Sequence, residues 1–356
     1  ARESIAAAIG AEAREIVFTS GATESNNLAI RGLAERQRRR GNHLVSVTTE
    51  HKAVLDPLRR LSRRGFEVTL LEVEQHGSPR AGWLDPQRVA EAIQEDTLLV
   101  SVMLANNEIG ILQPIAEIAA ICQSRGVPLH CDATQAVGKV PVDVRQLGID
   151  LLSFSGHKIY GPKGVGALYV RRGGPRLEPL IDGGGQENGL RSGTLNVPGI
   201  VGFAKALELC VAEFPAEMLR LAGLRHRLWE GLRQAVPDVV LNGPEFEAVP
   251  SSGPDGVGGL LCRLPANLNC SFPFVNGEAL MMSMKTIAVS SGSACTSANP
   301  EPSHVLAALG LGEDLTRASL RFGLGRFNTE EEIDYAVAAV AENVHRLRQL
   351  SSIASP

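Results

Sequence analysis

From residue 16 to about residue 170 the sequence repeats one alternation, in which a short apolar run is followed by a helical pattern. The apolar runs have the length of β-strands, and polar or turn-forming residues follow each of them. Neighbouring strands joined by helices must run parallel, because a parallel pair needs a long crossover connection. We therefore predict an α/β fold with a mostly parallel sheet, with strands at 15–19, 43–48, 67–73, 98–105, 127–131, 151–155 and 167–170.

The C-terminal part of the sequence is organised differently. Residues 202–235 have a long helical pattern, and residues 243–258 are rich in Gly, Pro and Ser, as in a surface loop. Shorter elements follow, with strands expected at 267–271, 286–290 and 320–323 and helices at 277–284 and 329–350. Since 356 residues suffice for two domains, we predict a large domain over residues 1–212 and a smaller α/β domain over residues 213–356.

Composition excludes several classes of function. A net charge of −4 gives no electrostatic case for binding nucleic acid or a membrane surface. No apolar stretch is long enough to span a bilayer, and the N-terminus lacks a secretion signal. The six cysteines are scattered without a CxxC pair, so neither a zinc site nor a dithiol redox motif is expected. Free cysteines in a chain of this size suit a reducing cytoplasm.

Ligands of parallel sheets bind beyond the carboxyl ends of the strands. The predicted strands are followed there by polar residues of functional type, at 21–23, 49–51, 106–108, 132–135 and 156–158. Ordinary connections would carry a more random mixture of residues. We therefore look for the chemistry of the chain among these five segments.

Lys158 and Asp132 end two of these strands and suggest a pyridoxal-phosphate site. A desolvated lysine can act as a Schiff-base nucleophile, although Lys158 taken alone reads more simply as a surface residue. A carboxylate beside a buried strand needs a cationic or hydrogen-bonded partner, which the protonated ring nitrogen of the cofactor would supply. Asp132 alone could equally be a helix cap or turn residue. Both residues at neighbouring strand ends make the cofactor the better interpretation.

Nearby residues could supply the other contacts of such a cofactor. A helix that opens with small residues presents free N–H groups to a phosphate, and a serine and a histidine beside the lysine could join them. His51 could stack on a flat ring, and Gln135, one helical turn beyond Asp132, could reach the ring hydroxyl. A single histidine is more often structural, and many helices start with small residues. The candidate phosphate ligands are Ala22, Thr23, Ser155 and His157.

Two residues of the C-terminal part could act on a substrate. Cys295 lies in a run of small and turn-forming residues at 290–300, whereas the other five cysteines lie in or beside apolar runs. A thiol on a polar loop is a candidate nucleophile, or else an incidental exposed group. Arg321 lies in a strand-like segment, where it could bind a substrate carboxylate or form a structural ion pair. Arg326 is the rival for the first role.

The chain resembles the cysteine desulfurases of the class V aminotransferase superfamily. Residues 153–164, SFSGHKIYGPKG, are similar to their cofactor-lysine motif, and residues 290–297 resemble the sulfur-acceptor loop of the group I members. Residues 49–54, 106–110 and 191–194 are similar to other signatures of the family. The resemblance extends from Phe18 to Asp334 and implies the type I pyridoxal-phosphate fold.

The resemblance also implies a role for each candidate. Lys158 would form a Schiff base with the cofactor and move protons, Asp132 would pair with the ring nitrogen, His51 would stack on the ring, and Gln135 would bind the ring hydroxyl. Ala22, Thr23, Ser155 and His157 would bind the phosphate, joined by Thr194 from the second subunit of a homodimer. Asn107 and Arg321 would hold the carboxylate of L-cysteine. Cys295 would take the sulfur as a persulfide, leaving alanine, for delivery to an acceptor or scaffold protein.

Two departures and two alternatives accompany this interpretation. Family members usually begin with a loop of the type Asp-Asn-Asn-Ala-Thr-Thr-Pro, which would precede Ala1, and many bacterial members carry a longer C-terminal tail that docks the scaffold. A related pyridoxal-phosphate lyase, acting on selenocysteine or cystine, would share the cofactor site. An inert partner protein that keeps the fold is the alternative outside catalysis.

Overall fold

A computed structural model describes residues 1–244, 246, 262–291 and 302–350, so the expected acceptor Cys295 lies outside the described residues. The chain forms two compact units. Unit 1 comprises Ala1–Glu72, Leu84–Asn106 and Gln113–Phe214, and unit 2 comprises Val73–Trp83, Asn107–Leu112 and Pro215–Pro356.

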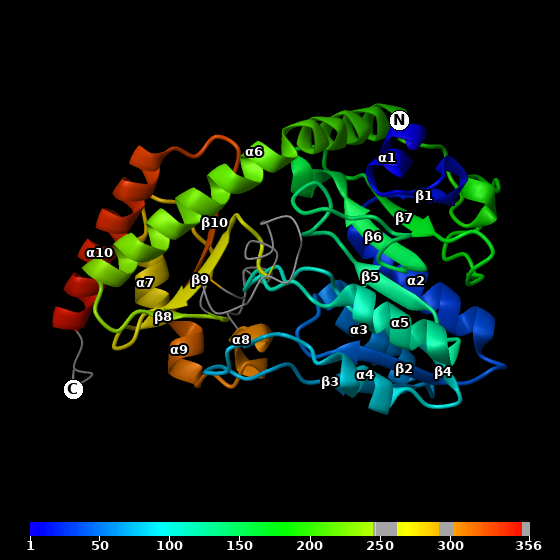
Figure 1. Cartoon of the computed structure of the whole chain (residues 1–356), viewed down its shortest axis with the longest axis horizontal. Coiled ribbons are helices and arrows are strands. Elements are labelled where there is room, and N and C mark those ends of the chain that lie inside the picture. Colours follow the sequence, from blue (N-terminus) through cyan, green and yellow to red (C-terminus); the bar gives the residue numbers. More distant parts are fainter. Residues whose placement is uncertain (245, 247–261, 292–301, 351–356) are drawn as a thin grey trace. The chain divides into compact units, whose positions relative to one another are not determined.

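Unit 1 is built on a seven-stranded sheet in the order β1-β7-β6-β5-β4-β2-β3. In Figure 1 these strands descend from β1 and β7 near the top to β2 and β3 near the bottom. Only β7 runs antiparallel to its neighbours, so the carboxyl ends of the other six strands share one edge. The strands are β1 (Ile16–Thr19), β2 (His43–Val47), β3 (Glu67–Leu71), β4 (Thr97–Ser101), β5 (Leu129–Asp132), β6 (Leu151–Ser155) and β7 (Gly166–Val170).

Helices connect these strands as the alternation predicted. The helices of unit 1 before the long α6 are α1 (Arg2–Ala8), α2 (Ala22–Gln37), α3 (Lys52–Ser62), α4 (Pro86–Ala92) and α5 (Ile115–Arg125), with 3-10 turns η1 (Ala13–Glu15), η2 (Gly156–Ile159) and η3 (Glu187–Gly189). The apolar face of α2 packs against β4, β6 and β7, where Leu28 and Leu33 join one buried cluster with Leu99, Leu151 and Leu168. This packing holds the first turn of α2 at the carboxyl edge of the sheet.

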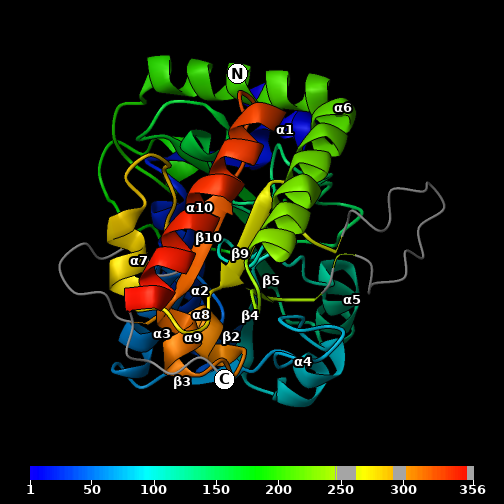
Figure 2. The ribbon, with the colours of Figure 1, turned by 90° about the vertical axis from the view of Figure 1, so that its left-hand side faces the viewer.

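Unit 2 contains an antiparallel sheet in the order β10-β9-β8. Figure 2 shows helix α10 and the C-terminal half of α6 lying over β9 and β10. The two helices are adjacent, because Arg227 of α6 pairs with Asp334 of α10. The elements are α6 (Val197–Ala235), which enters from unit 1, β8 (Val240–Leu241), β9 (Asn267–Ser271), α7 (Gly277–Ser283), α8 (His304–Ala308), α9 (Glu313–Arg317), β10 (Ser319–Gly323) and α10 (Glu330–Leu350).

Two details differ from the sequence-based expectations. Residues 286–290, expected as a strand, contribute only Ser290, which bridges to Arg321. The segments Val73–Trp83 and Asn107–Leu112 belong to unit 2, because backbone hydrogen bonds tie them to C-terminal residues. These bonds include His76 N to Leu309 O and Leu264 N to Gly110 O. The division into domains at residue 212 stays a prediction.

Candidate active site

The carboxyl edge of the sheet in unit 1 collects most of the predicted site residues. Because β1, β2, β5 and β6 run in the same direction, the segments that follow them emerge at one edge. Each of these segments carries at least one candidate. The residues placed there are Ala22 and Thr23 after β1, His51 after β2, Asp132 and Gln135 at and after β5, and Ser155, His157 and Lys158 at and after β6.

Asp132 is a buried carboxylate whose two oxygens are both held by donors. Asp132 is 5% exposed. Asn26 Nδ2 donates to Oδ2 over 2.7 Å, and the backbone N of Thr134 donates to Oδ1 over 2.9 Å. Donors on both oxygens fix the orientation of the carboxylate. Each oxygen keeps a further lone pair with which it could accept from a cationic ring nitrogen.

His51 caps helix α3 and carries a neutral ring. Its Nδ1 accepts from the backbone N of Ala53 over 3.0 Å, which leaves Nε2 to carry the proton. Burial lowers the pKa of His51 below its ordinary value, and the charge of Lys158 lowers it further, whereas Asp132 opposes the shift. A neutral imidazole that responds to the charges of both Asp132 and Lys158 is suited to lie against an aromatic cofactor.

Lys158 lies in the short 3-10 turn η2 that follows β6, with its side chain exposed. Ser155, at the end of β6, shares a hydrogen bond of 2.8 Å between its Oγ and His157 Nδ1. Burial lowers the pKa of His157, and the charges of Lys158, Lys163 and Lys139 lower it further. Since the chain has only six lysines, three of them acting on one histidine mark this edge as locally positive.

The first turn of α2 approaches β7 closely. Its N-cap Gly21 has φ +153° and provides no side-chain acceptor for the N–H groups of Ala22 and Thr23. A Cβ atom on Gly166 would lie 2.7 Å from Gly21 Cα, so glycine is required there for the helix to begin beside Ser155. Free N–H groups at the start of a 16-residue helix are a site for phosphate.

Gln135, at the same edge, and Thr194 form contacts with residues other than Asp132, His51 and Lys158. Gln135 Oε1 accepts from Lys139 Nζ over 2.8 Å. Thr194 is exposed, and Arg191 of the same segment pairs with Glu24 in the first turn of α2 over 2.8 Å. The segment 191–194 is therefore attached to the helix that begins at the candidate phosphate site.

Unit 2 brings together the two predicted substrate ligands. A guanidinium nitrogen of Arg321, on β10, donates to the backbone oxygen of Asn107 over 2.9 Å. The buried Oδ1 of Asn107 has no hydrogen-bond partner among the residues that the structure describes. Arg321 also pairs through its backbone with Ser290, which precedes Cys295 by five residues in the sequence. Arg321 therefore contacts both the other predicted carboxylate ligand, Asn107, and Ser290, the first residue of the segment 290–297 that resembles the sulfur-acceptor loop.

Comparison with known proteins identifies the family. The aminotransferase class-V family matches residues 1–336. The chain belongs to this family. The expected pyridoxal phosphate and the enzyme class are confirmed, because members of the family depend on this cofactor.

Members named cysteine desulfurase are among the relatives. "Cysteine desulfurase IscS" of Anaeromyxobacter dehalogenans (strain 2CP-C) is 55% identical, covering 99% of this chain and 83% of the relative. The same-named protein of Salmonella newport (strain SL254) is 51% identical over 99% of this chain and 82% of the relative. The resemblance to cysteine desulfurases is thereby confirmed.

Solved structures agree with this assignment. A NifS-like protein has a TM-score of 0.85 at 37% identity, covering 97% of this chain and 87% of that chain. DndA from Streptomyces lividans has a TM-score of 0.74 at 40% identity, covering 90% of this chain and 86% of that chain. The expected α/β fold with a mostly parallel sheet is confirmed.

Three buried polar residues near this edge were given no individual role from the sequence, although Glu50 and Asn106 lie within the polar segments 49–51 and 106–108. Asn26 is 1% exposed and bonds to Asp132, Glu50 is fully buried and accepts from the backbone N of Met103, and Asn106 Nδ2 donates to Thr49 O over 2.9 Å. Asn26 lies four residues after Ala22 and so on the same face of α2, which is the one sequence signal that could have identified it.

The residues present fit pyridoxal phosphate. The positive edge near His157 and the first turn of α2 match the phosphate, and Asp132 matches a protonated ring nitrogen. The buried hydroxyls of Thr49 and Thr134 have no hydrogen-bond partner among the described residues, as expected for groups that await a polar ligand. The candidate site therefore has both the charges and the spare hydrogen-bonding groups that this cofactor needs.

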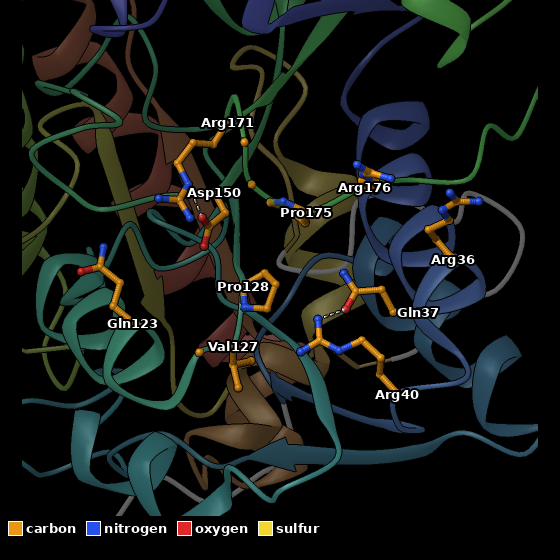
Figure 3. A pocket seen from close by; sticks show the side chains of 13 residues that line it. Arg36, Gln37, Arg40, Gln123, Val127, Pro128, Asp150, Arg171, Pro175 and Arg176 are labelled. Carbon is orange, nitrogen blue, oxygen red and sulfur yellow. Dashed lines mark hydrogen bonds and ion pairs between the residues drawn. The ribbon is translucent and has the colours of Figure 1, made fainter.

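A hollow of about 530 Å³ lies at the opposite edge of the sheet (Figure 3). Arginines surround it, but Arg171 is bonded to Asp150 over 2.6 Å, and Arg36 and Arg40 lie at the C-terminal end of α2, where cations suit the helix dipole. None of the predicted site residues lines it. We therefore assign the chemistry to the carboxyl edge.

The described residues also bear on two other classes of function. No group of three or more His, Cys, Asp or Glu side chains in the described part of the chain could hold a metal ion. None of the helices in that part combines the length and apolar character that crossing a bilayer requires.

Proposed function

We propose that this chain is a cysteine desulfurase that converts L-cysteine to L-alanine and transfers the sulfur to Cys295 as a persulfide. The observation that carries the proposal is the edge cluster of Lys158, His51 and the doubly held Asp132, in a chain 55% identical to a protein of that name. Delivery of the sulfur to an acceptor or scaffold protein, for iron–sulfur clusters or thio-cofactors, is part of the proposal.

Each residue has a stated task in this reaction. Pyridoxal phosphate, when bound, supplies an electron sink for charge that develops on the substrate. Lys158 Nζ would carry the cofactor and move the proton of the substrate Cα. Asp132 would bind the ring nitrogen, His51 would lie on the ring, and Gln135 would turn from Lys139 to the ring hydroxyl. The phosphate would be held by Ala22, Thr23, Ser155 and His157.

The substrate would be bound and attacked by residues of unit 2. Arg321 and the Nδ2 of Asn107 would donate to the carboxylate of cysteine, and the bond from Arg321 to the backbone oxygen of Asn107 keeps the two residues together. The thiolate of Cys295 attacks the substrate sulfur, so an S–S bond forms as the Cβ–S bond breaks. The electron pair of that bond stays on Cβ, which gains a proton and leaves as alanine. No external oxidant or reductant is needed to form the persulfide.

A homodimer in the cytoplasm completes the proposal. Thr194 is exposed at the end of a segment that Arg191 attaches to the first turn of α2, so it is available to a partner's phosphate site. The five cysteines of the described part are free thiols, which suits a reducing compartment. A stable monomer that holds cofactor at full occupancy, measured by light scattering, would refute the shared site.

Release of alanine and sulfide from cysteine tests the reaction. Without a reductant we expect about one alanine per chain, because the persulfide is not discharged. With a thiol reductant, alanine and sulfide should form continuously and in equal amounts. Alanine formed only from selenocysteine would favour the lyase alternative, and no product from any of these substrates would favour the inert partner.

A further inference from the structure

A glycine-rich loop, residues 183–193, leads to Thr194 in unit 1. Five of its eleven residues are glycine, and a segment of this composition is intrinsically flexible. Thr194 itself is exposed. A side chain that binds a ligand from the end of a flexible loop loses affinity, because ordering the loop costs entropy. The contacts that already order the 183–193 loop therefore decide how well Thr194 can serve as a ligand.

Glu187 attaches the loop to strand β1. It is 8% exposed, whereas both of its neighbours in the sequence are more accessible. Its carboxylate forms a two-bond ion pair with the guanidinium of Arg2, at 2.6 and 2.9 Å, and it also accepts from the backbone N of Phe18 over 2.8 Å. The Arg2 guanidinium lies over the Phe18 ring, 4.5 Å from its centre. A planar pair of this kind fixes the orientation of the carboxylate.

The backbone at Glu187 has an unfavourable conformation. The φ angle is +49° at Glu187, +57° at Asn188 and +79° at Gly189, so three consecutive residues are left-handed. Glycine adopts this conformation without a steric cost, but other residues keep it only where surrounding contacts enforce it. The three hydrogen bonds to the Glu187 carboxylate supply such contacts. They hold a turn in the middle of the loop.

Gln186 closes the loop next to Thr194. Its Oε1 accepts from the backbone N of Gly193 over 2.8 Å, and Gly193 directly precedes Thr194. A second bond across the loop joins the backbone N of Gly185 to the Oγ of the buried Ser192 over 3.2 Å. The two ends of the loop are therefore held together, and the backbone that leads into Thr194 is fixed.

The loop has a second attachment on the other side of its turn. Arg191 Nε donates to Glu24 Oε1 over 2.8 Å, and Glu24 lies in the first turn of α2. Glu187 and Arg191 thus anchor the loop at two points within unit 1, ahead of the exposed Thr194. This arrangement lowers the entropy cost of using the Thr194 hydroxyl as a ligand.

We propose that Gln186 and Glu187 are positioning residues that present Thr194 to the phosphate site of the partner subunit. The inference rests on the proposed function, in which a homodimer shares its phosphate sites. Both residues act through Thr194, by ordering the loop before it, and without touching the cofactor. Their loss should therefore weaken pyridoxal-phosphate binding in the partner subunit rather than in the subunit that carries the substitution.

Hydrogen exchange in the cofactor-free protein tests the ordering of the loop. Glu187→Gln keeps the size of the side chain but loses the charge that pairs with Arg2. Backbone amides of the 183–193 loop should then exchange roughly tenfold faster, since a bond between charged groups is lost. Glu178→Gln is the matched control, because it makes the same change at a carboxylate that pairs with Arg36. We expect the control to leave exchange in the loop unchanged.

Gln186→Ala is a milder variant that tests the same loop. The Gln186 side chain is only partly buried, and its replacement removes the acceptor of the Gly193 N–H. The Gly193 amide should exchange about two- to tenfold faster, as expected for the loss of one neutral hydrogen bond. This variant takes the place of Glu187→Gln in every test if the latter does not fold. Exchange at the parental rate in both variants would overturn the inference.

Mixed dimers reveal in which subunit cofactor binding is weakened. In the first dimer, one chain carries both Glu187→Gln and Lys158→Ala, and the other chain is parental. The remaining Lys158 then lies in a site that would receive Thr194 from the variant chain. Titration with pyridoxal phosphate, followed by the absorbance of lysine-bound cofactor, should show roughly tenfold weaker binding, the contribution of one hydrogen bond to a charged group. The reference is a dimer of parental and Lys158→Ala chains.

The second mixed dimer reverses the arrangement. One chain carries Glu187→Gln and the other carries Lys158→Ala, so the remaining Lys158 would receive Thr194 from an unaltered loop. We expect this site to bind pyridoxal phosphate with the affinity of the reference dimer. A loss of affinity in the second dimer, or no loss in the first, would refute the inference, because the loop would then not act on the partner's phosphate site.

The parent protein decides the proposed function separately. A parent that binds no pyridoxal phosphate, or that holds it at full occupancy as a monomer, refutes the shared site, and the inference falls with it. Failure of the inference alone appears in the variants of a parent that forms dimers and binds the cofactor. The hydrogen-exchange measurement needs no cofactor, so it tests the contacts of Gln186 and Glu187 in either case.

Discussion

Replacing Arg321 by lysine should weaken cysteine binding without removing the positive charge. The guanidinium already uses one donor on the backbone oxygen of Asn107, over 2.9 Å, and its other donors form a planar fork that matches a carboxylate. Lysine keeps the charge but has no such fork. It can therefore serve the substrate or Asn107, but it cannot form both hydrogen bonds in the same geometry.

The size of the effect follows from the hydrogen bond to the substrate that lysine cannot form. One hydrogen bond between charged groups contributes about 1.5–3 kcal/mol, which corresponds to roughly a 10- to 150-fold change in affinity. Because this bond is made in the ground state as well as in the transition state, its removal should appear mainly as a higher KM with kcat less affected.

Steady-state alanine release as a function of cysteine concentration measures both constants. Arg326→Lys is the matched control, since Arg326 follows five residues later and is the rival carboxylate ligand. We expect Arg326→Lys to keep the parental KM. The reasoning is refuted if Arg321→Lys also keeps it, or if the Arg326 variant alone loses affinity.

Three further predictions concern the cofactor, acid stability and the thiols. Borohydride reduction followed by peptide mapping should label Lys158, and a label on another lysine would contradict the assignment. Burial lowers the pKa of His130 to about 4, so between pH 6.5 and 4 the imidazole of His130 is protonated in the unfolded chain but not in the folded one. The free energy of unfolding should therefore fall by about 3 kcal/mol as the pH drops through this range. Urea titrations at several pH values should show that the free energy of unfolding of His130→Gln falls less steeply between pH 6.5 and 4 than that of the parent. An equally steep fall in the variant would count against this explanation. Cys295→Ser should bind cofactor and lose sulfide release. Turnover should be retained in single Ser variants of the other five cysteines, because burial disfavours their reactive thiolate form. Burial raises the thiol pKa of Cys122, Cys131, Cys262 and Cys270, and Cys210 is also buried.

The sheet and its carboxyl edge could be predicted because both follow from local patterns. Alternating strands and helices fix a parallel direction, and the direction places Asp132 and Lys158 at one edge whatever the details of packing. The strand expected at 127–131 is observed at Leu129–Asp132, and the one expected at 151–155 at Leu151–Ser155.

Long-range pairing could not be predicted in the same way. Val73–Trp83 and Asn107–Leu112 join unit 2 through hydrogen bonds such as His76 N to Leu309 O, which connect residues far apart in the sequence. Periodicity is a local property and carries no signal for such partners. The burial of Asn26 and Glu50 could not be predicted either, because a polar residue near a helix start or in a turn normally faces solvent. Only the packing shows that both are buried against the site.

The most direct test of the proposed mechanism is the mass of the protein after one turnover. Incubation with cysteine in the absence of a reductant, followed by peptide mass spectrometry, should find one added sulfur atom on the peptide that contains Cys295, together with one equivalent of alanine. The added sulfur and the alanine should both be absent in Lys158→Ala. Alanine produced in the parent with no sulfur on Cys295, or with the sulfur on another cysteine, would contradict the persulfide mechanism proposed for this chain.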